Sequence, residues 1–441
     1  MFKKNRIQWA VCLALVPFSA PLMAASEAEM QARIKQLEAE LQKAKEELAE
    51  AKAKPVAVAV PQEDTAMDFD VAGGTLNVGG AVRVNYAAGT YAKSGNNAPS
   101  RNFSDGGNFA LDTFRVNMDY TNGGVVGKME YRFYNGYHFL HTGWLGYNYD
   151  DGSQVQVGVN RVPFGPGPYG VSQSFFFDQH YYLGFSDDMD LGVKYQWKTG
   201  DWDWAAAYYL QDEGSYKGSS KKADRYSYDI IPNNAGNGYE ERNQVNFRGI
   251  YSTKLGSTTA DMGFSVQAGQ LEGQGVNNAG NPTQDGDMYA VSLHMINKWQ
   301  NYSLASQITK YEYDVDQVGA TRGEITAGAY AFPTSIAAEA TIPAVSLSYN
   351  LKTPSIPWLN YVVPFVEYST ILKDEPGFND SELYTIGAAF STAGGWYTYA
   401  EWVTSDGNDF IGGDTAFGQR FGSNPDDGRQ HRFNINFGYY F

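Results

Sequence analysis

The sequence predicts an all-β protein, a transmembrane antiparallel up-and-down β-barrel of about 16 strands preceded by a short coiled-coil helix. Three observations predict this fold. From residue 70 to residue 441, apolar residues alternate with polar or small ones, the period of strands with one apolar face. Short turn sequences alternate along this region with long polar stretches. The 48 Gly and 32 Tyr among 441 residues suit tight turns and aromatic girdles at membrane interfaces.

The composition excludes several other classes of protein. The single cysteine, Cys12, cannot build a disulfide framework or a cysteine-ligated metal centre. No apolar run long enough for a transmembrane helix follows the first 25 residues. With 33 Lys and Arg against 49 Asp and Glu, the formal net charge is −16, which argues against a nucleic-acid partner. An aromatic content of 15% argues against disorder.

Residues 1–24 are predicted to be a secretory signal peptide. A positively charged start precedes the apolar stretch 7–18, and small residues around Ala24 offer a cleavage site. The alternative, an N-terminal membrane anchor, is disfavoured because the apolar run is short and is interrupted by Pro17 and Pro21. Cys12 lies within this segment, so we expect the mature chain to contain no thiol.

Residues 25–54 are predicted to form a periplasmic coiled coil. Their apolar residues alternate spacings of four and three, the heptad pattern. The a and d positions are Met30, Ile34, Leu37, Leu41, Ala44, Leu48 and Ala51. The g and e positions of a parallel assembly pair opposite charges, as in Glu40 with Lys45 and Glu47 with Lys52. The alternative is a solvated single helix. Pro55 ends the helix, and residues 55–69 are predicted to be an extended linker.

Residues 70–441 are predicted to form the outer-membrane barrel domain. The first strand alternates Leu76, Val78, Val82 and Val84 with polar or small residues. The last strand does the same and ends in Phe441. One apolar and one polar face suit a strand that separates lipid from a wet interior. Because water-soluble sandwiches show the same alternation, the connections between the strands must distinguish the two folds.

The connections indicate a barrel with two different rims. The short turns are residues 121–124 (TNGG), 150–152 (DDG), 198–201 (KTGD), 254–257 (KLGS), 297–300 (NKWQ), 352–358 (KTPSIPW) and 392–395 (TAGG). The long stretches include residues 87–107, 165–187, 212–240, 314–335 and 407–428. Seven short turns separate eight pairs of strands, which predicts sixteen strands, an even number as such barrels have. Aromatic residues at strand ends are predicted to form the interface girdles, among them Tyr131, Phe133, Tyr134, Tyr147, Tyr149, Tyr208, Tyr209 and Trp396.

With its signal peptide, coiled coil and terminal Phe441, the chain resembles the trimeric bacterial outer-membrane porins. Segments 111–120 (LDTFRVNMDY) and 155–164 (VQVGVNRVPF) are similar to the phosphate-selective porin O and P group and its dicarboxylate-porin relatives. The resemblance implies a homotrimer in outer-membrane lipid and lipopolysaccharide. It also implies assembly by the barrel machinery through Phe441, with peptidoglycan near the coiled coil. Anion-selective members carry ladders of Arg and Lys, whereas this chain is acidic, so phosphate selectivity does not carry over directly.

The alternation predicts a basic stripe on the inner wall. The inward basic residues are Arg83, Arg115, Lys128, Arg132, Lys194, Arg248 and Arg432, against Asp119, Glu130, Glu367 and Glu401. The third loop, residues 165–190, folds into the lumen in the family that the chain resembles. It carries Asp178, Asp187 and Asp188. The predicted constriction or solute-binding residues are therefore Arg83, Arg115, Lys128, Arg132, Arg432, Asp178, Asp187 and Asp188. A basic wall facing an acidic loop would set ion preference; the alternative is that these charges only keep the wall rigid.

The third loop also carries six aromatic residues, Phe175, Phe176, Phe177, Tyr181, Tyr182 and Phe185. They suit either a surface for solutes or, as we favour, anchors that hold the loop against the wall.

No cofactor and no metal site are predicted. Residues 165–170 (GPGPYG) match a dinucleotide-binding pattern literally, but prolines remove the amides that such a site needs. His138 and His141 lie three apart on a predicted strand and point to opposite faces. Asp426 and Asp427 are either calcium ligands or solvated loop charges.

Three classes of function remain. The first is a passive channel for small hydrophilic solutes or ions, either general or specific for anions such as phosphate or dicarboxylates, or for sugars. The second is a barrel enzyme, a phospholipase or protease, for which no Ser, His and acid set stands out, so no enzyme activity is expected. The third is a structural tether in which the coiled coil holds the barrel near the cell wall.

Overall fold

The computed structural model describes residues 35, 67–90, 107–220, 222–315, 321–412, 418–425 and 428–441. The chain divides into two units, residues 1–55 and 56–441. The predicted signal peptide, the coiled coil apart from the helical Lys35, and Asp426 and Asp427 lie outside the described residues. No helix within the described ranges is long and apolar enough to cross a bilayer.

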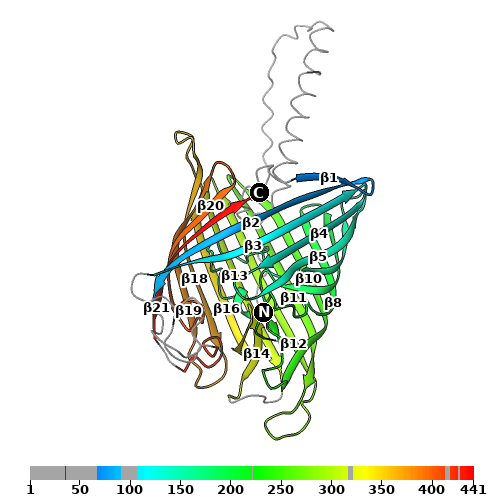
Figure 1. Ribbon diagram of the computed structural model, residues 1–441, viewed down its shortest axis with the longest axis vertical. Coiled ribbons are helices and arrows are strands. Elements are labelled where there is room, and N and C mark those ends of the chain that lie inside the picture. The colour runs from blue at the N-terminus through cyan, green and yellow to red at the C-terminus, as the bar shows by residue number, and fades with distance from the viewer. Residues whose placement is uncertain are drawn as a thin grey trace, which may run out of the picture. The chain divides into compact units, whose positions relative to one another are not determined.

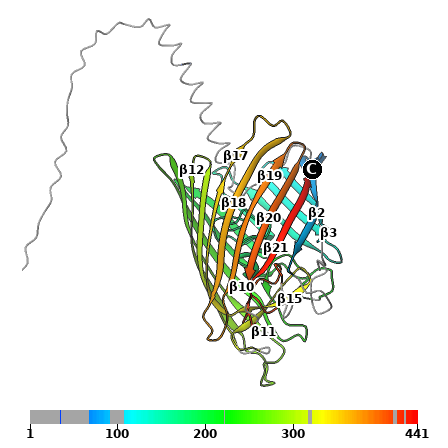
Figure 2. The same cartoon turned by 90° about the vertical axis from the view of Figure 1, so that its left-hand side faces the viewer.

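Sixteen antiparallel strands close into a barrel, which confirms the predicted fold class and strand number. The barrel strands are β2 (Gly74–Gly89), β3 (Asn108–Asn122), β4 (Val125–Phe133), β5 (His138–Asn148), β6 (Gln154–Arg161), β7 (Met189–Thr199), β8 (Trp202–Asp212), β10 (Gly238–Leu255), β11 (Thr258–Gln274), β12 (Gly286–Trp299), β13 (Tyr302–Asp314), β16 (Glu339–Tyr349), β18 (Leu359–Lys373), β19 (Ser381–Thr392), β20 (Trp396–Asp406) and β21 (Gln430–Tyr440). Each strand pairs with the next, and β21 closes the barrel on β2, from Ala81 opposite Tyr440 to Gly89 opposite Arg432. Figures 1 and 2 show β21, in red, beside β2, in blue.

Each of the seven predicted short turns joins two consecutive barrel strands. Gly200 and Gly256 take positive φ angles of 59° and 66° in two of these turns, a conformation that residues with a Cβ rarely adopt. The longer connections gather at the other end of the barrel (Figure 1). The placement of turn-forming residues along the chain therefore gives the barrel short connections at one end and long connections at the other.

The strands have the alternating burial that a barrel in lipid requires. On β12, Val291 and Leu293 expose 48% and 60% of their surface, whereas the intervening Ser292 is fully buried. Residues such as Phe109, Ile308 and Ile386 are likewise exposed on other strands. Because the apolar side chains point outward and the polar ones inward, the outer face matches a bilayer and the lumen matches water.

Short strands extend the ends of the barrel. β1 (Met67–Val71) forms a hairpin with β2, so residues 67–69 of the predicted linker lie in a strand. β17 (Leu351–Lys352) pairs with β18. Within the long loops, β14 (Glu324–Ala329) pairs with both β9 (Asp229–Ile230) and β15 (Phe332–Ala337) in a separate three-stranded sheet.

The long loops pack against one another and against the inner wall. We number them by their order along the chain: the third loop is residues 162–188, the fourth 213–237, the sixth 315–338 and the eighth 407–429. One buried apolar cluster joins all four loops with the inward side chains of the wall. Representative members are Tyr182, Ile230, Ile325, Phe421 and, from the wall, Tyr311. The lumen at this end is therefore narrowed by folded chain.

Two of the predicted girdle residues face inward instead. Tyr208 exposes 43% of its surface, as a girdle residue would, but Tyr209 is fully buried. Tyr134 is half-buried and lines the cavity described below. Two neighbouring aromatic residues in one sequence cluster thus serve opposite faces, because successive residues of a strand point to opposite faces.

Candidate functional site: a cavity between the wall and the third loop

The third loop crosses the lumen and is bound to the far wall. It leaves β6, contains the short helix η1 (Tyr181–Leu183) and re-enters the barrel at β7. The backbone N–H of Gln173 donates to Glu367 on β18 at 2.5 Å, and that of Phe175 donates to Glu401 on β20 at 3.0 Å. Two wall carboxylates assigned to the lumen by alternation therefore hold the loop.

Side chains strengthen this attachment. The Ser172 hydroxyl donates to Glu367 at 2.5 Å, and the Ser174 hydroxyl donates to Glu401. The Gln179 N–H donates to the Ser369 hydroxyl at 3.1 Å. Each carboxylate thus accepts both a main-chain and a side-chain hydrogen bond from the loop, which determines where the loop crosses the lumen.

A buried relay anchors the middle of the loop. His180 Nδ1 lies 2.8 Å from Asp178 Oδ1, and His180 Nε2 lies 3.0 Å from the Thr309 hydroxyl on β13. Their order resembles an acid, histidine and hydroxyl triad. His180 and Thr309 are fully buried and Asp178 is 3% exposed, so no solute reaches the hydroxyl. The relay therefore joins loop to wall.

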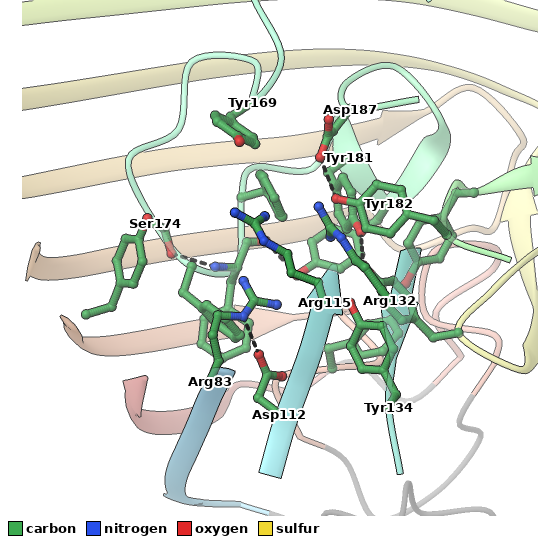
Figure 3. A pocket seen from close by; sticks show the side chains of 18 of the residues that line it. Arg83, Asp112, Arg115, Arg132, Tyr134, Tyr169, Ser174, Tyr181, Tyr182 and Asp187 are labelled. Atoms are coloured by element: carbon green, nitrogen blue, oxygen red, sulfur yellow. Dashed lines mark hydrogen bonds and ion pairs between the residues drawn. The ribbon is translucent and has the colours of Figure 1, made fainter. Parts of the chain in front are cut away.

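A cavity of about 540 Å³ lies between the third loop and the wall formed by β2, β3, β4 and β21. Figure 3 shows Arg83, Arg115 and Arg132 on the wall strands, with Tyr169, Tyr181, Tyr182 and Asp187 of the third loop around the same space. Arg432 also lines it, together with aromatic residues of the fourth, sixth and eighth loops. A space of this size, bounded by polar and aromatic groups, suits the binding of small solutes.

Aromatic rings position the four cavity arginines. The guanidinium carbon of Arg132 lies 4.4 Å from the ring centre of Tyr226, and that of Arg432 lies 4.5 Å from Phe176. Arg83 lies over Phe175 at 5.5 Å, and Arg115 over Tyr440 at 5.2 Å. Stacking holds a guanidinium by its face and leaves N–H groups at its edge to donate to an anion.

Ion pairs compensate only part of this positive charge. Arg83 Nε lies 2.9 Å from Asp112, and Glu130 accepts from Arg132 at 2.5 Å and from Arg115 at 3.5 Å. The cavity is lined by four arginines and by two carboxylates, Asp112 and Asp187. The formal charges of the lining residues therefore sum to +2.

Asp187 is held as an anion at the edge of the cavity. It pairs with Arg161 at 2.7 Å and accepts the Tyr226 hydroxyl hydrogen bond. Burial alone would raise the pKa of Asp187, but the Arg161 guanidinium and the neighbouring His141 outweigh burial and hold this pKa below its ordinary value. The third loop and the fourth loop are thereby joined through one carboxylate.

The other predicted site residues lie in different places. Lys128 pairs with Asp119 at 2.8 Å near a short turn, where both side chains are more than 40% exposed. Asp178 belongs to the buried relay. Asp188 is 6% exposed and lies beside Asp190 and Asp229. None of Lys128, Asp178 and Asp188 is among the residues that line the cavity.

Several cavity residues are not indicated by the sequence pattern. Asp112 should face outward by alternation with Thr113, but a register shift between Arg83 and Val84 in the pairing of β2 with β3 turns it inward. Tyr226 and Tyr330 come from the fourth and sixth loops, where no period exists to be read. Arg161 does not line the cavity itself, but it ends β6 just before the third loop and pairs with the lining residue Asp187.

The third-loop aromatic residues pack against the wall and other loops, and some of them also line the cavity. Phe185 packs against Tyr311 of the wall, with ring centres 5.1 Å apart. Tyr182 packs against Phe421 of the eighth loop at 5.1 Å and also lines the cavity. One ring can therefore anchor the loop and border the cavity at the same time.

The fold is similar to solved structures of outer-membrane proteins, although no protein-family model and no curated protein sequence matches the chain. The outer membrane channel DcaP of Acinetobacter baumannii superposes with a TM-score of 0.55 at 14% identity, over 84% of this chain and 99% of DcaP. OmpT of Vibrio cholerae, an outer membrane protein in trimer form, gives 0.51 at 15% identity over 83% and 99%. An anion-selective porin from Comamonas acidovorans gives 0.50 at 11% identity over 83% and 100%. The chain therefore has the barrel fold of bacterial outer-membrane porins.

Proposed function

We propose that this protein is a passive outer-membrane channel of the porin type whose constriction prefers small hydrophilic anions. The observation that carries the proposal is the cavity lined by four arginines and only two carboxylates, between the wall and a third loop held across the lumen. In a narrow space with low-dielectric walls, an excess of two positive charges raises the local concentration of anions and lowers that of cations.

The proposed preference is opposite to the net charge of the whole chain. The formal net charge is −16, but the cavity lining is basic. Asp178 and Asp188 of the third loop are buried and lie outside the lining, so Asp187 is the loop carboxylate that faces the arginines. Selectivity depends on the charges nearest the passing ion, because charges more than about 10 Å away are largely screened at 0.1 M salt.

The comparisons support the location and the assembly that we propose. Proteins with this fold include one described as an outer membrane channel, one in a trimer form and one described as an anion-selective porin. We infer the same for this chain: a homotrimer in outer-membrane lipid and lipopolysaccharide, assembled through its C-terminal Phe441. The signal peptide and a periplasmic coiled coil near peptidoglycan remain part of this proposal.

A barrel enzyme is the weaker alternative. The arrangement that most resembles a hydrolase triad, Asp178, His180 and Thr309, is buried between loop and wall and opens to neither lipid nor lumen. The charged cavity inside the barrel supports the channel instead. The tether function depends on residues 25–54 and leaves the channel proposal unchanged.

The test is the reversal potential of the purified protein in planar bilayers under a KCl gradient. We expect the native protein to conduct in three steps and to favour chloride. Replacing Arg83→Gln together with Arg115→Gln cancels the charge excess, so the preference for chloride should fall severalfold or disappear. The difference in chloride preference between the native protein and this double variant should narrow at about 1 M salt, where the screening length falls to about 3 Å.

The matched control removes two arginines that do not line the cavity. Arg242 pairs with Glu240 and Glu272, and Arg429 pairs with Glu382. The double variant Arg242→Gln and Arg429→Gln should keep the native reversal potential. A native protein that inserts without conducting would refute the channel, and one that favours potassium would refute the anion preference.

A further inference from the structure

Six buried carboxylates and one buried arginine lie at the end of the barrel where the third and fourth loops meet. The carboxylates belong to the end of the third loop, the start of β7, the end of β8, the start of the fourth loop, β9 and the start of β10. The carboxylates are Asp188, Asp190, Asp212, Glu213, Asp229 and Glu241, and none exposes more than 7% of its surface. The arginine is Arg225, 3% exposed, which pairs with Asp212 and Asp229 at 2.6 Å each. One arginine therefore pairs with two of six acidic groups that are shielded from water.

Existing hydrogen bonds satisfy one side of this cluster. Glu213 Oε1 accepts the N–H groups of Tyr226 and Ser227 at 3.1 and 2.8 Å. Glu241 Oε1 accepts the Ile230 N–H at 2.8 Å, and Asp190 Oδ2 accepts from Gln244 at 2.9 Å. These hydrogen bonds occupy one oxygen of each of these three carboxylates and fix its position.

The other side of the cluster is unsatisfied. Asp188, Asp190 and Asp229 each offer one oxygen, and the three oxygens lie within 4.8 Å of one another. The Oδ1 atoms of these three residues, and Glu213 Oε2, are buried and have no hydrogen-bond partner among the residues that the structure describes. Burying a carboxylate oxygen without a partner is costly, and a cation that binds several such oxygens removes that cost.

We propose that Asp188, Asp190 and Asp229 form a binding site for a divalent cation, specifically calcium, with Glu213 beside them. The donors are all carboxylate oxygens, with no imidazole or thiolate, which selects a hard cation over zinc or copper. Calcium accepts six to eight oxygens in flexible geometry, whereas magnesium retains several waters that a site this buried has little room to hold. The site is separate from the cavity and goes beyond the channel function.

Calcium at this position would hold together three segments. Asp188 ends the third loop, Asp190 lies on β7, and Asp229 lies on β9 in the fourth loop. Asp188 also follows Asp187, the carboxylate that faces the cavity arginines. We therefore expect the ion to stabilise the loops that bound the constriction without contacting a solute.

The test uses the full chain folded in detergent, stripped with EDTA and titrated with calcium alone or with terbium as a luminescent substitute. Tyr209 and Tyr313 lie close enough to Asp188 to interact with it electrostatically and can sensitise terbium emission. We expect saturable emission that calcium displaces and magnesium displaces poorly. In the double variant Asp190→Asn with Asp229→Asn, the affinity for calcium should fall by at least about 10- to 100-fold. Loss of a residue that only hydrogen-bonds to a metal ligand already has an effect of that size.

Thermal unfolding gives a second readout. The native melting temperature should rise with calcium and fall with EDTA. The double variant, which no longer confines so many like charges, should melt at the same temperature in both conditions. As a control, Asp203→Asn with Asp261→Asn removes two carboxylates near the short turns and should keep the native response to calcium.

Each outcome decides the proposal. Calcium binding that persists unchanged in the double variant would place the ion elsewhere. An absence of saturable binding would mean that bound protons, and not a cation, neutralise the carboxylates. Equal affinity for magnesium would refute calcium as the ion. If the double variant does not fold, anomalous scattering from calcium-grown crystals of the native protein decides, with a peak expected between the three carboxylates. Conductance of the calcium-free protein tests the channel separately.

Discussion

At the scale of single residues, the wall charges are bound into a network before any solute arrives. Arg132 donates to Glu130 at 2.5 Å, stacks on Tyr226 and exposes only 7% of its surface. Arg115 shares Glu130 at the longer distance of 3.5 Å and is more exposed. Arg132 therefore acts mainly in the structure of the wall, whereas Arg83 and Arg115 present more of their charge to the lumen.

Replacing Arg132→Gln should destabilise the barrel because Glu130 then remains buried with less compensation. Removing one partner of a buried pair typically costs about 3–5 kcal/mol. We expect a loss of this order in the free energy of unfolding, measured by denaturant titration in detergent micelles. Arg242→Gln, in a more exposed ion pair, should cost less than about 1 kcal/mol. Equal losses of unfolding free energy in the two variants would show that the buried Arg132 ion pair stabilises the barrel no more than the exposed Arg242 pair.

At the scale of elements, the third loop is placed by the carboxylates that receive it. Glu367 and Glu401 face the lumen by strand alternation, and each accepts a backbone N–H and a serine hydroxyl of the loop. Charged acceptors make stronger hydrogen bonds than neutral ones. The width of the cavity thus depends on two wall carboxylates on β18 and β20.

Removing both carboxylates, with Glu367→Ala and Glu401→Ala, should release the tip of the third loop. Each buried donor that loses its partner costs about 1–3 kcal/mol, so the loop should leave the wall while the barrel strands remain paired. We expect larger fluctuations of the open-channel current and a higher mean conductance in single-channel recordings. The control Glu312→Ala with Glu382→Ala changes the charge equally without touching the loop, and it should record like the native protein. Current fluctuations in the Glu367→Ala and Glu401→Ala variant that equal those of the native protein would contradict this account of the loop.

At the scale of the whole molecule, the barrel depends on the seam between its first and last strands. Gly80 N–H donates to the Phe441 carbonyl at 2.6 Å, and Phe441 N–H donates to the Gly80 carbonyl at 3.0 Å. A Cβ at Gly80 would lie 2.5 Å from the Arg115 carbonyl oxygen and 3.0 Å from the Phe441 ring. The terminal aromatic residue therefore packs where the chain closes on itself.

Gly80→Ala should strain this seam. Forcing a methyl group into a filled space typically costs about 1–3 kcal/mol, and we expect a loss of that size in the free energy of unfolding. Gly167→Ala is the control, because a Cβ there meets no atom within 4 Å; surface changes of this kind usually stay within about 0.5 kcal/mol. If both substitutions are neutral, the seam tolerates more than its geometry indicates.

The sequence by itself determined the barrel. Period-two alternation, seven short turns and an apolar last strand specify sixteen antiparallel strands, because each of these signals is local to a strand or a turn. The same period indicates the inward direction of Arg83, Arg115, Arg132 and Arg432, which the structure brings to one cavity.

Only the tertiary structure decided what those side chains meet. A bulge turns Asp112 inward against the alternation, since one extra residue reverses the face of everything beyond it. The long loops have no period, so the attachment of residue 173 to Glu367, and the meeting of Asp188 with Asp229, follow from contacts between distant segments. Local patterns specify which way a side chain points, whereas its partner depends on how the loops fill the lumen.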